Sequence, residues 1–180
     1  MVGNEVPSSY ESHSPRTRTD AGRLHHRRTP LNSYLDSSAL VKAFVTEDGS
    51  EQVLDLLSQT GLAATSRVSY VECRAALSRA LREGRIASRD EQRARRALDQ
   101  RWANLAVVEL DDALGREAGT LTRAHALRAA DAIHLASAQV LAGEENADTR
   151  FLCWDKRLWG AAAALGFATF PVTLPDAPQR

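Results

Sequence analysis

Four acidic side chains, far apart in the sequence, carry the clearest chemistry that the chain offers: Asp36, Glu72, Asp131 and Asp155. Their separations of 36, 59 and 24 residues match no local motif, so only a tertiary fold can bring them together. Carboxylates that share one cleft repel each other and raise one another's pKa values. A hard divalent cation such as Mg²⁺ or Mn²⁺ relieves that repulsion, activates water and holds a phosphate oxygen. The four acids therefore predict metal-assisted hydrolysis of a phosphodiester bond.

The elements that must position these acids alternate between short β-like runs and longer helical runs. Strands are predicted at residues 32–36, 62–66, 106–110, 150–154 and 167–172. Helices are predicted at residues 38–44, 50–60, 70–84, 90–105, 113–127, 129–141 and 155–166. Strands separated by helices form right-handed βαβ units, because parallel neighbours require a crossover. The fold class is therefore α/β, a single three-layer α/β/α domain with a short parallel sheet covered on both faces.

The ends of three helices carry sequence signals of their own. Ser66 or Ser69 is expected to cap the helix over 70–84, and Asp111 or Asp112 the helix over 113–127. Ser88 or Asp90 is expected to open the helix between them. Glycine is expected to close two helices, at Gly84 and at Gly166, because it adopts the left-handed conformation without strain.

Each of the four acids stands near the carboxyl end of a predicted strand, where open parallel sheets form their sites. Asp36 ends the first strand and Asp155 follows the fourth. Glu72 lies in the first turns of the helix after the second strand, and Asp131 begins the apolar helix over 129–141. The alternative is that each is a helix cap or first-turn acid, which the positive helix end favours. Asp131 fits that alternative least, because a carboxylate on a buried helix needs a partner or a metal.

Four segments around these acids resemble the PIN-domain ribonucleases, specifically the VapC-type toxins of bacterial toxin–antitoxin pairs: YLDSSALVK, TSRVSYVECRAAL, LRAADAIHLASA and CWDKRL. The resemblance covers roughly residues 31–172. It implies a Mg²⁺- or Mn²⁺-dependent endoribonuclease whose catalytic and metal-binding acids are Asp36, Glu72, Asp131 and Asp155. It also implies an RNA substrate, a cognate antitoxin that occupies the acidic cleft, and a homodimer.

Several side chains near the four acids are candidates for a supporting role. The hydroxyl or backbone N–H of Ser37 offers a contact to the metal shell or a phosphate, although capping a helix explains it equally well. Cys153 stands where the family often has Thr or Ser, and a thiol is a poor partner for water on a hard cation. Arg157 is expected to steady the acids through an ion pair, and His134 to pack or support rather than to bind metal. Phosphate binding or ordinary surface charge explains the basic residues Arg67, Arg74 and Lys156.

Composition narrows the class of protein. The chain has 180 residues with 23 basic and 23 acidic side chains, so its formal net charge is zero. That balance disfavours a nucleic-acid binder held by bulk positive charge, while a local basic rim remains compatible with it. Two cysteines, Cys73 and Cys153, predict no disulfide framework and fit a reducing cytosol. Because no run of 18 apolar residues is present, we expect a cytoplasmic protein without membrane association.

Three parts of the chain are distinguished by composition. Residues 1–30 hold few large apolar side chains, and we expect a disordered N-terminal extension because it buries too little surface to offset ordering entropy. A basic arm that contacts RNA or a partner, an over-extended gene start and a leader remain alternatives for this segment. The nuclease-like domain is expected over residues 31–173, and residues 174–180 as a C-terminal tail.

Two other functions compete with the nuclease. A non-catalytic PIN-like module that binds RNA or a partner has no need of four acids. An α/β enzyme that transfers phosphoryl groups through an aspartyl nucleophile would use Asp36, but a second acid is expected two residues later, where Ser38 stands. Glycine-rich phosphate loops are absent from the sequence. Both alternatives therefore explain fewer of the candidate acids than the metal-dependent nuclease does.

Overall fold

Five parallel strands form one sheet, with β1 at its centre. The computed structural model describes residues 31–143 and 148–174, so the predicted extension over 1–30 and nearly all of the tail over 174–180 lie outside the described residues. The strand order is β3-β2-β1-β4-β5. The strands are β1 Asn32–Leu35, β2 Ala63–Ser66, β3 Ala106–Val108, β4 Thr149–Leu152 and β5 Ala168–Phe170. All neighbouring pairs run parallel, which confirms the predicted sheet.

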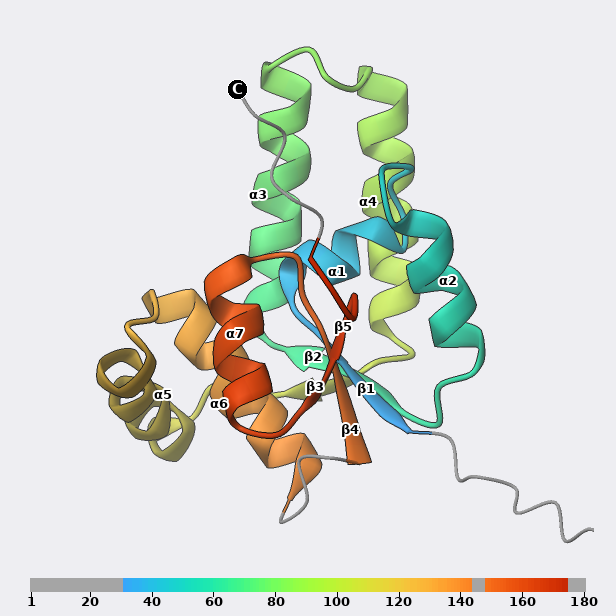
Figure 1. Cartoon of the computed structure of the whole chain (residues 1–180). Helices are drawn as coiled ribbons and strands as arrows, with labels where there is room; N and C mark the ends of the chain where they lie inside the picture. The colour runs from blue at the N-terminus through green and yellow to red at the C-terminus, as the bar shows by residue number, and fades with distance from the viewer. Residues whose placement is uncertain (1–30, 144–147, 175–180) are drawn as a thin grey trace, which may run out of the picture.

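Helices cover both faces of this sheet, which confirms the three-layer α/β/α architecture (Figure 1). One face carries α1 Ser37–Lys42, α2 Ser50–Ser58, α3 Val68–Arg82 and α4 Ser88–Trp102. The other face carries α5 Asp112–His125, α6 Ala129–Ala142 and α7 Lys156–Ala164. Helices α3 and α4 lie side by side and extend beyond the carboxyl edge of the sheet. In the described part of the chain, no helix has the length and apolar character that a membrane span requires.

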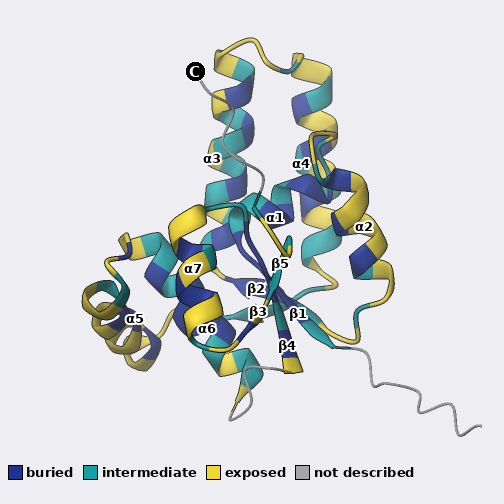
Figure 2. Cartoon of the chain, in the orientation of Figure 1, coloured by how far each residue is buried: buried dark blue, intermediate teal, exposed yellow. Residues whose placement is uncertain are grey.

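The alternation of side chains along the two central strands supplies both cores. Tyr34 in β1 and Phe151 in β4 point to the face that α5, α6 and α7 cover. The next residue of each strand, Leu35 and Leu152, points to the opposite face, against α1 to α4. Successive residues of a strand face opposite sides, so a fully covered strand needs apolar residues at consecutive positions. Figure 2 accordingly shows the central strands as buried.

The predicted capping residue of α3 is wrong. The N-cap of α3 is Arg67, and its backbone is already helical, with φ −53° and ψ −35°. A capping side chain needs a non-helical backbone at that position, so neither Ser66 nor Ser69 caps this helix. The hydroxyl of Ser69 instead shares a 2.6 Å hydrogen bond with that of Thr65. Helix α4 begins at Ser88, as predicted.

The other signals at helix ends are confirmed. Asp111 is the N-cap of α5 and accepts a 2.8 Å hydrogen bond from the backbone N–H of Leu114. Gly84 and Gly166 follow α3 and α7 with φ values of +67° and +87°. These values lie in the left-handed region, which explains why glycine occupies both positions.

Replacing Asp111 with Ala is expected to lower the free energy of unfolding by about 1 kcal/mol, because the start of α5 loses its side-chain acceptor. Urea denaturation measures the loss. Asp111→Asn is the matched control and should retain nearly all of the stability, since Asn caps as well as Asp. Equal losses in the two variants would assign the effect to charge rather than to capping.

Candidate active site

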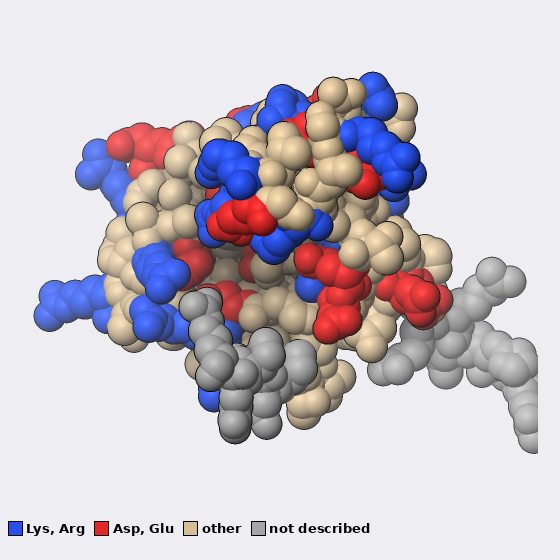
Figure 3. All heavy atoms as spheres, turned by 90° about the horizontal axis from the view of Figure 1, so that it is seen from above, with Lys and Arg blue, Asp and Glu red and all other residues tan. Residues whose placement is uncertain are grey.

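The carboxyl edge of the sheet gathers the segments that carry the predicted acids. Helix α1 follows β1 directly, and α7 follows β4 after three residues. Because β1 and β4 are neighbours while their crossovers run to opposite faces, the edge between them is a switch point of the topology. Figure 3 looks onto this edge and shows acidic side chains around a hollow, with Lys and Arg side chains on its rim.

Asp36 is fixed at the start of α1 and is nearly inaccessible, with 4% of its surface exposed. Its Oδ1 accepts a 2.7 Å hydrogen bond from the backbone N–H of Ala39, and the hydroxyl of Ser38 lies 2.8 and 2.9 Å from its two oxygens. Burial raises the pKa of Asp36, although His134, Ala39 and Ser38 oppose the shift. The folded chain therefore holds a carboxylate whose negative charge lacks full compensation.

Ser38 connects two of the predicted segments. Besides contacting Asp36, its hydroxyl oxygen accepts a 2.9 Å hydrogen bond from the backbone N–H of Trp154. Trp154 immediately precedes Asp155, so one hydroxyl group links the turn after β1 to the turn after β4. No supporting role for Ser38 was predicted from the sequence. The spacing from Asp36 could have indicated this role, because a Ser two residues after an Asp at a helix start commonly bonds the Asp carboxylate or nearby backbone.

Glu72 is held by two side chains through a single oxygen. Its Oε2 accepts a hydrogen bond from the hydroxyl of Ser37 and lies 2.8 Å from Nε2 of His134. Burial raises the pKa of Glu72, but the bonds from His134 and Ser37 and the charge of His134 together hold it below its ordinary value. Ser37 is the first residue of α1 rather than its cap, and its hydroxyl supports Glu72. His134 supports Glu72 as well, in agreement with its predicted role.

The group formed by Ser37, His134 and Glu72 is not a nucleophile triad. In such a triad, the serine and the acid bind different nitrogens of the imidazole. Here Ser37 and Glu72 both approach Nε2, at 3.2 and 2.8 Å, and Nδ1 lies 2.9 Å from the hydroxyl of Tyr34. The arrangement therefore holds the carboxylate in place and does not activate the serine.

Asp155 and Asp131 lie close enough to interact. Asp155 is the N-cap of α7, and its Oδ1 accepts hydrogen bonds from the backbone N–H groups of Arg157 and Leu158 at 2.9 and 3.0 Å. Asp131 is half-buried in the first turn of α6. Burial and the charge of Asp155 raise the pKa of Asp131, against smaller opposing effects of Arg128 and His134. This is the like-charge repulsion that the sequence analysis expected between neighbouring acids.

Two buried thiols each lie near a pair of the acids. Burial raises the pKa of Cys153, and the charges of Asp36 and Asp155 raise it further. Burial also raises the pKa of Cys73, with the charges of Glu72 and Asp36 adding to it. Each thiol therefore lies within the field of two acids. Cys153 is buried and accepts a 3.2 Å hydrogen bond from the backbone N–H of Asp155, which fits a packing role for the thiol.

The donor set fits a hard divalent cation. All four groups are carboxylates, and the pKa values of two of them, Asp36 and Asp131, are raised, a cost of charge that a cation would offset. Within residues 31–143 and 148–174, no three side chains of His, Cys, Asp or Glu converge closely enough to hold one ion as they stand. The assignment of Asp36, Glu72, Asp131 and Asp155 as ligands of one metal site therefore stays a prediction.

The expected ion pair of Arg157 is wrong. Its guanidinium donates a 3.4 Å hydrogen bond to the backbone carbonyl of Ala126, in the turn between α5 and α6. Its contact with Asp155 is made by the backbone N–H instead, because Arg157 lies in the first turn of the helix that Asp155 caps. Two other basic candidates pair with acids outside the predicted quartet: Arg67 with Glu109, and Arg74 with Asp99. Lys156 is exposed beside Asp155.

Comparison with known proteins adds sequence relatives. The model of the PIN domain family matches residues 33–150. Ribonuclease VapC45 and Ribonuclease VapC49, from two strains of Mycobacterium tuberculosis, are each 39% identical to the chain over 141 residues. The matched region is 78% of this chain and 96% of each relative.

Solved structures share the fold at lower sequence identity. Mycobacterium tuberculosis VapC20, described as a sarcin–ricin loop cleaving toxin, has a TM-score of 0.57 at 16% identity. A toxin–antitoxin complex from Klebsiella pneumoniae has a TM-score of 0.56 at 17% identity. Each match covers 80% of this chain and all of the other. At these identities the likeness demonstrates a common fold.

Proposed function

Since the chain belongs to the PIN-domain family and is related to its VapC ribonucleases, we propose that it is a VapC-type toxin, an endoribonuclease that hydrolyses phosphodiester bonds of RNA. The observation that carries the proposal is the 39% identity over 96% of the length of the VapC relatives. The acids gathered at the carboxyl edge of the sheet support it, because that edge is where open parallel sheets place their sites.

The residues proposed to hold a divalent cation are Asp36, Glu72, Asp131 and Asp155. When bound, Mg²⁺ or Mn²⁺ supplies a water of lowered pKa and a positive charge for a phosphate oxygen. The chain's own groups keep the carboxylates in place. Asp155 receives both of its backbone bonds at Oδ1, and Glu72 receives both of its side-chain bonds at Oε2. Among the described residues no hydrogen bond reaches the second oxygen of either carboxylate, so each retains a free acceptor.

The RNA is proposed to bind across this edge through local positive charge, since the chain as a whole is neutral. Lys156 and Arg157 are exposed next to Asp155 and offer two cationic groups to phosphates. Family membership also supports a cognate antitoxin protein that covers the acidic cleft, and a homodimer. The two free thiols, Cys73 and Cys153, fit the cytosolic location that we propose.

Cleavage of RNA oligonucleotides by the purified chain tests the function. We expect cleavage with Mg²⁺ or Mn²⁺, no cleavage in EDTA, and recovery when excess Mn²⁺ is restored, because the water nucleophile depends on the cation. Asp36→Asn should be inactive, whereas Asp112→Asn, at an exposed acid in α5, should cleave like the wild type. Equal cleavage in EDTA would refute the metal mechanism. Binding of RNA without cleavage under every metal condition would favour the non-catalytic module.

A further inference from the structure

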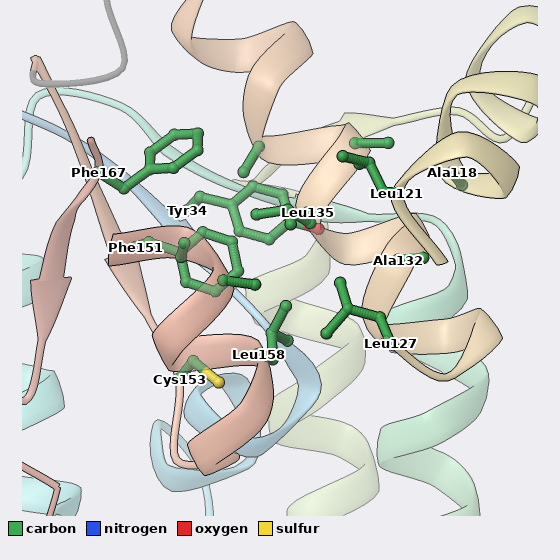
Figure 4. Packing of buried hydrophobic residues seen from close by; sticks show 14 of the residues in the cluster. Tyr34, Ala118, Leu121, Leu127, Ala132, Leu135, Phe151, Cys153, Leu158 and Phe167 are labelled. Carbon is green, nitrogen blue, oxygen red and sulfur yellow. The ribbon is translucent and has the colours of Figure 1, made fainter. Parts of the chain in front are cut away.

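A buried tyrosine stands behind the acids and bonds to their supporting histidine. Tyr34 in β1 has no exposed surface, and its ring stacks on that of Phe151 with 5.3 Å between the centroids. Figure 4 shows it packed among apolar side chains that include Leu135 and Phe167. Its hydroxyl lies 2.9 Å from Nδ1 of His134, which is itself only 3% exposed. A polar contact therefore extends from the core to the candidate site.

The partners of His134 determine where its ring carries hydrogen. The Glu72 carboxylate can only accept hydrogen bonds, so Nε2 must be the donor in the 2.8 Å contact between them. In the neutral ring Nδ1 is then an acceptor, and Tyr34 must donate to it. Hydrogen bonds consequently run in one direction, from Tyr34 through the ring to Glu72.

Packing alone does not account for the Tyr34 hydroxyl. Phenylalanine at this position would keep the stacking on Phe151 and would avoid placing a polar group in the core. A buried hydroxyl costs free energy unless it is hydrogen-bonded, and here the bond that satisfies it leads to His134. Rotating the imidazole by half a turn would replace both nitrogen contacts with carbon contacts. From the core side, the hydroxyl therefore reinforces the ring orientation and the tautomer that the Glu72 contact requires.

We propose that Tyr34 is a positioning residue for the acidic site, which acts through His134 to hold Glu72 by Oε2 and leave its second oxygen available. The expected effect on RNA cleavage rests on the proposed nuclease function, whereas the positioning of His134 and Glu72 rests on the hydrogen bonds alone. Groups that orient a metal-binding carboxylate or imidazole from behind commonly change metal affinity or activity by about 10- to 100-fold when they are removed. Tyr34 is 38 residues from Glu72 in the sequence and contacts it only through His134.

Tyr34→Phe tests the proposal, because it removes only the hydroxyl. We expect Mn²⁺ affinity, measured by calorimetry, to fall about tenfold, and kcat for RNA cleavage to fall about tenfold with KM unchanged. In metal-free protein, ¹⁵N NMR of the imidazole should report the Nε2–H tautomer in the wild type and a mixture of tautomers in the variant.

Thr65→Val is the matched control. It removes another fully buried hydroxyl, from the neighbouring strand β2, which donates to the backbone carbonyl of Leu35 at 2.7 Å. This variant should lose stability while Mn²⁺ affinity, kcat and the His134 tautomer stay as in the wild type. If Thr65→Val changes them as much as Tyr34→Phe does, the effect is general loosening of the sheet and the proposal is wrong.

Variants of His134 test the route of the effect. His134→Gln keeps a donor near the position of Nε2 and should retain more Mn²⁺ affinity than His134→Leu, which keeps the volume without the donor. In the His134→Leu background, adding Tyr34→Phe should cost nothing further, because the two side chains act in series. Additive losses would overturn the proposal.

The NMR measurement separates this inference from the proposed function. If the wild type cleaves no RNA but Tyr34→Phe still mixes the tautomers, the nuclease assignment fails and the positioning of His134 stands. If the wild type cleaves RNA and Tyr34→Phe matches it in tautomer, metal affinity and kcat, the positioning role fails and the nuclease assignment stands.

Discussion

Asp131→Asn is expected to reduce RNA cleavage by about 10²- to 10³-fold, a loss typical for removing one group that stabilises charge at a reacting centre. The same variant, free of metal at pH 7, should melt at or above the temperature of the wild type. Activity falls while stability does not, because the negative charge of Asp131 is needed to bind the proposed cation but is unfavourable in the metal-free fold. Asn keeps nearly the shape of Asp, so packing around the first turn of α6 is preserved.

The expected stability change follows from the direction of the pKa shift. Burial and the charge of Asp155 raise the pKa of Asp131 above its unfolded value, so the folded state binds the proton more tightly than the unfolded state. For such a group the free energy of unfolding falls as pH rises from the unfolded pKa through the folded one, and the loss is complete above the folded pKa. Replacing the carboxylate removes that loss.

Thermal melts with and without Mn²⁺ measure the response of Asp131→Asn. A cation that binds only the folded wild type at one hundred times its Kd adds about 2.7 kcal/mol to the free energy of unfolding. The variant should gain much less, whereas Asp112→Asn should respond as the wild type does. Identical responses of Asp131→Asn and the wild type would remove Asp131 from the site and leave it a first-turn acid of α6.

Phe151→Ala should have the largest effect on stability, a loss of about 3–5 kcal/mol. Phe151 has no exposed surface and lies between Tyr34 and Phe167, with ring centroids 5.3 and 5.7 Å away. Removing its ring leaves a cavity at the centre of the sheet that neighbouring strands cannot close. A loss of this size is a large part of the 5–15 kcal/mol by which domains of this kind are stable.

Urea denaturation of Phe151→Ala and the wild type provides the measurement. Val140→Ala is the control, because Val140 in α6 is 62% exposed and its truncation should change the free energy of unfolding by less than about 0.5 kcal/mol. A loss below about 1 kcal/mol for Phe151→Ala would show that the site collapses around the missing ring, contrary to a tightly packed centre.

The sequence predicts those features of the fold that depend on periodicity. Alternating strands and helices predict the parallel sheet and its two covered faces, and consecutive apolar residues such as Tyr34 and Leu35 match strands buried on both sides. The capping residue of α3 was not predictable in this way. A cap depends on the φ and ψ angles of one residue, and at Arg67 the turn is already helical.

The candidate site is predictable in its acids and not in its hydrogen bonds. Helix starts after strands place Asp36 and Asp155 at one edge, and these two residues serve as caps and as candidate ligands at once. Tyr34 and His134 are 100 residues apart, and side-chain contacts at that distance depend on the completed packing. The predicted ion pair of Arg157 was wrong for the same reason, since its guanidinium bonds to the backbone of the turn between α5 and α6.

The strand order also governs when the site exists during protein synthesis. β1 is the first strand to leave the ribosome, but one of its two edges pairs with β4, which is made after α6. A growing chain that ends within α6 lacks both the strand that completes the centre of the sheet and the last acid, Asp155. A ribonuclease built in this order acquires its full set of candidate acids only when β4 and the turn that carries Asp155 have been made.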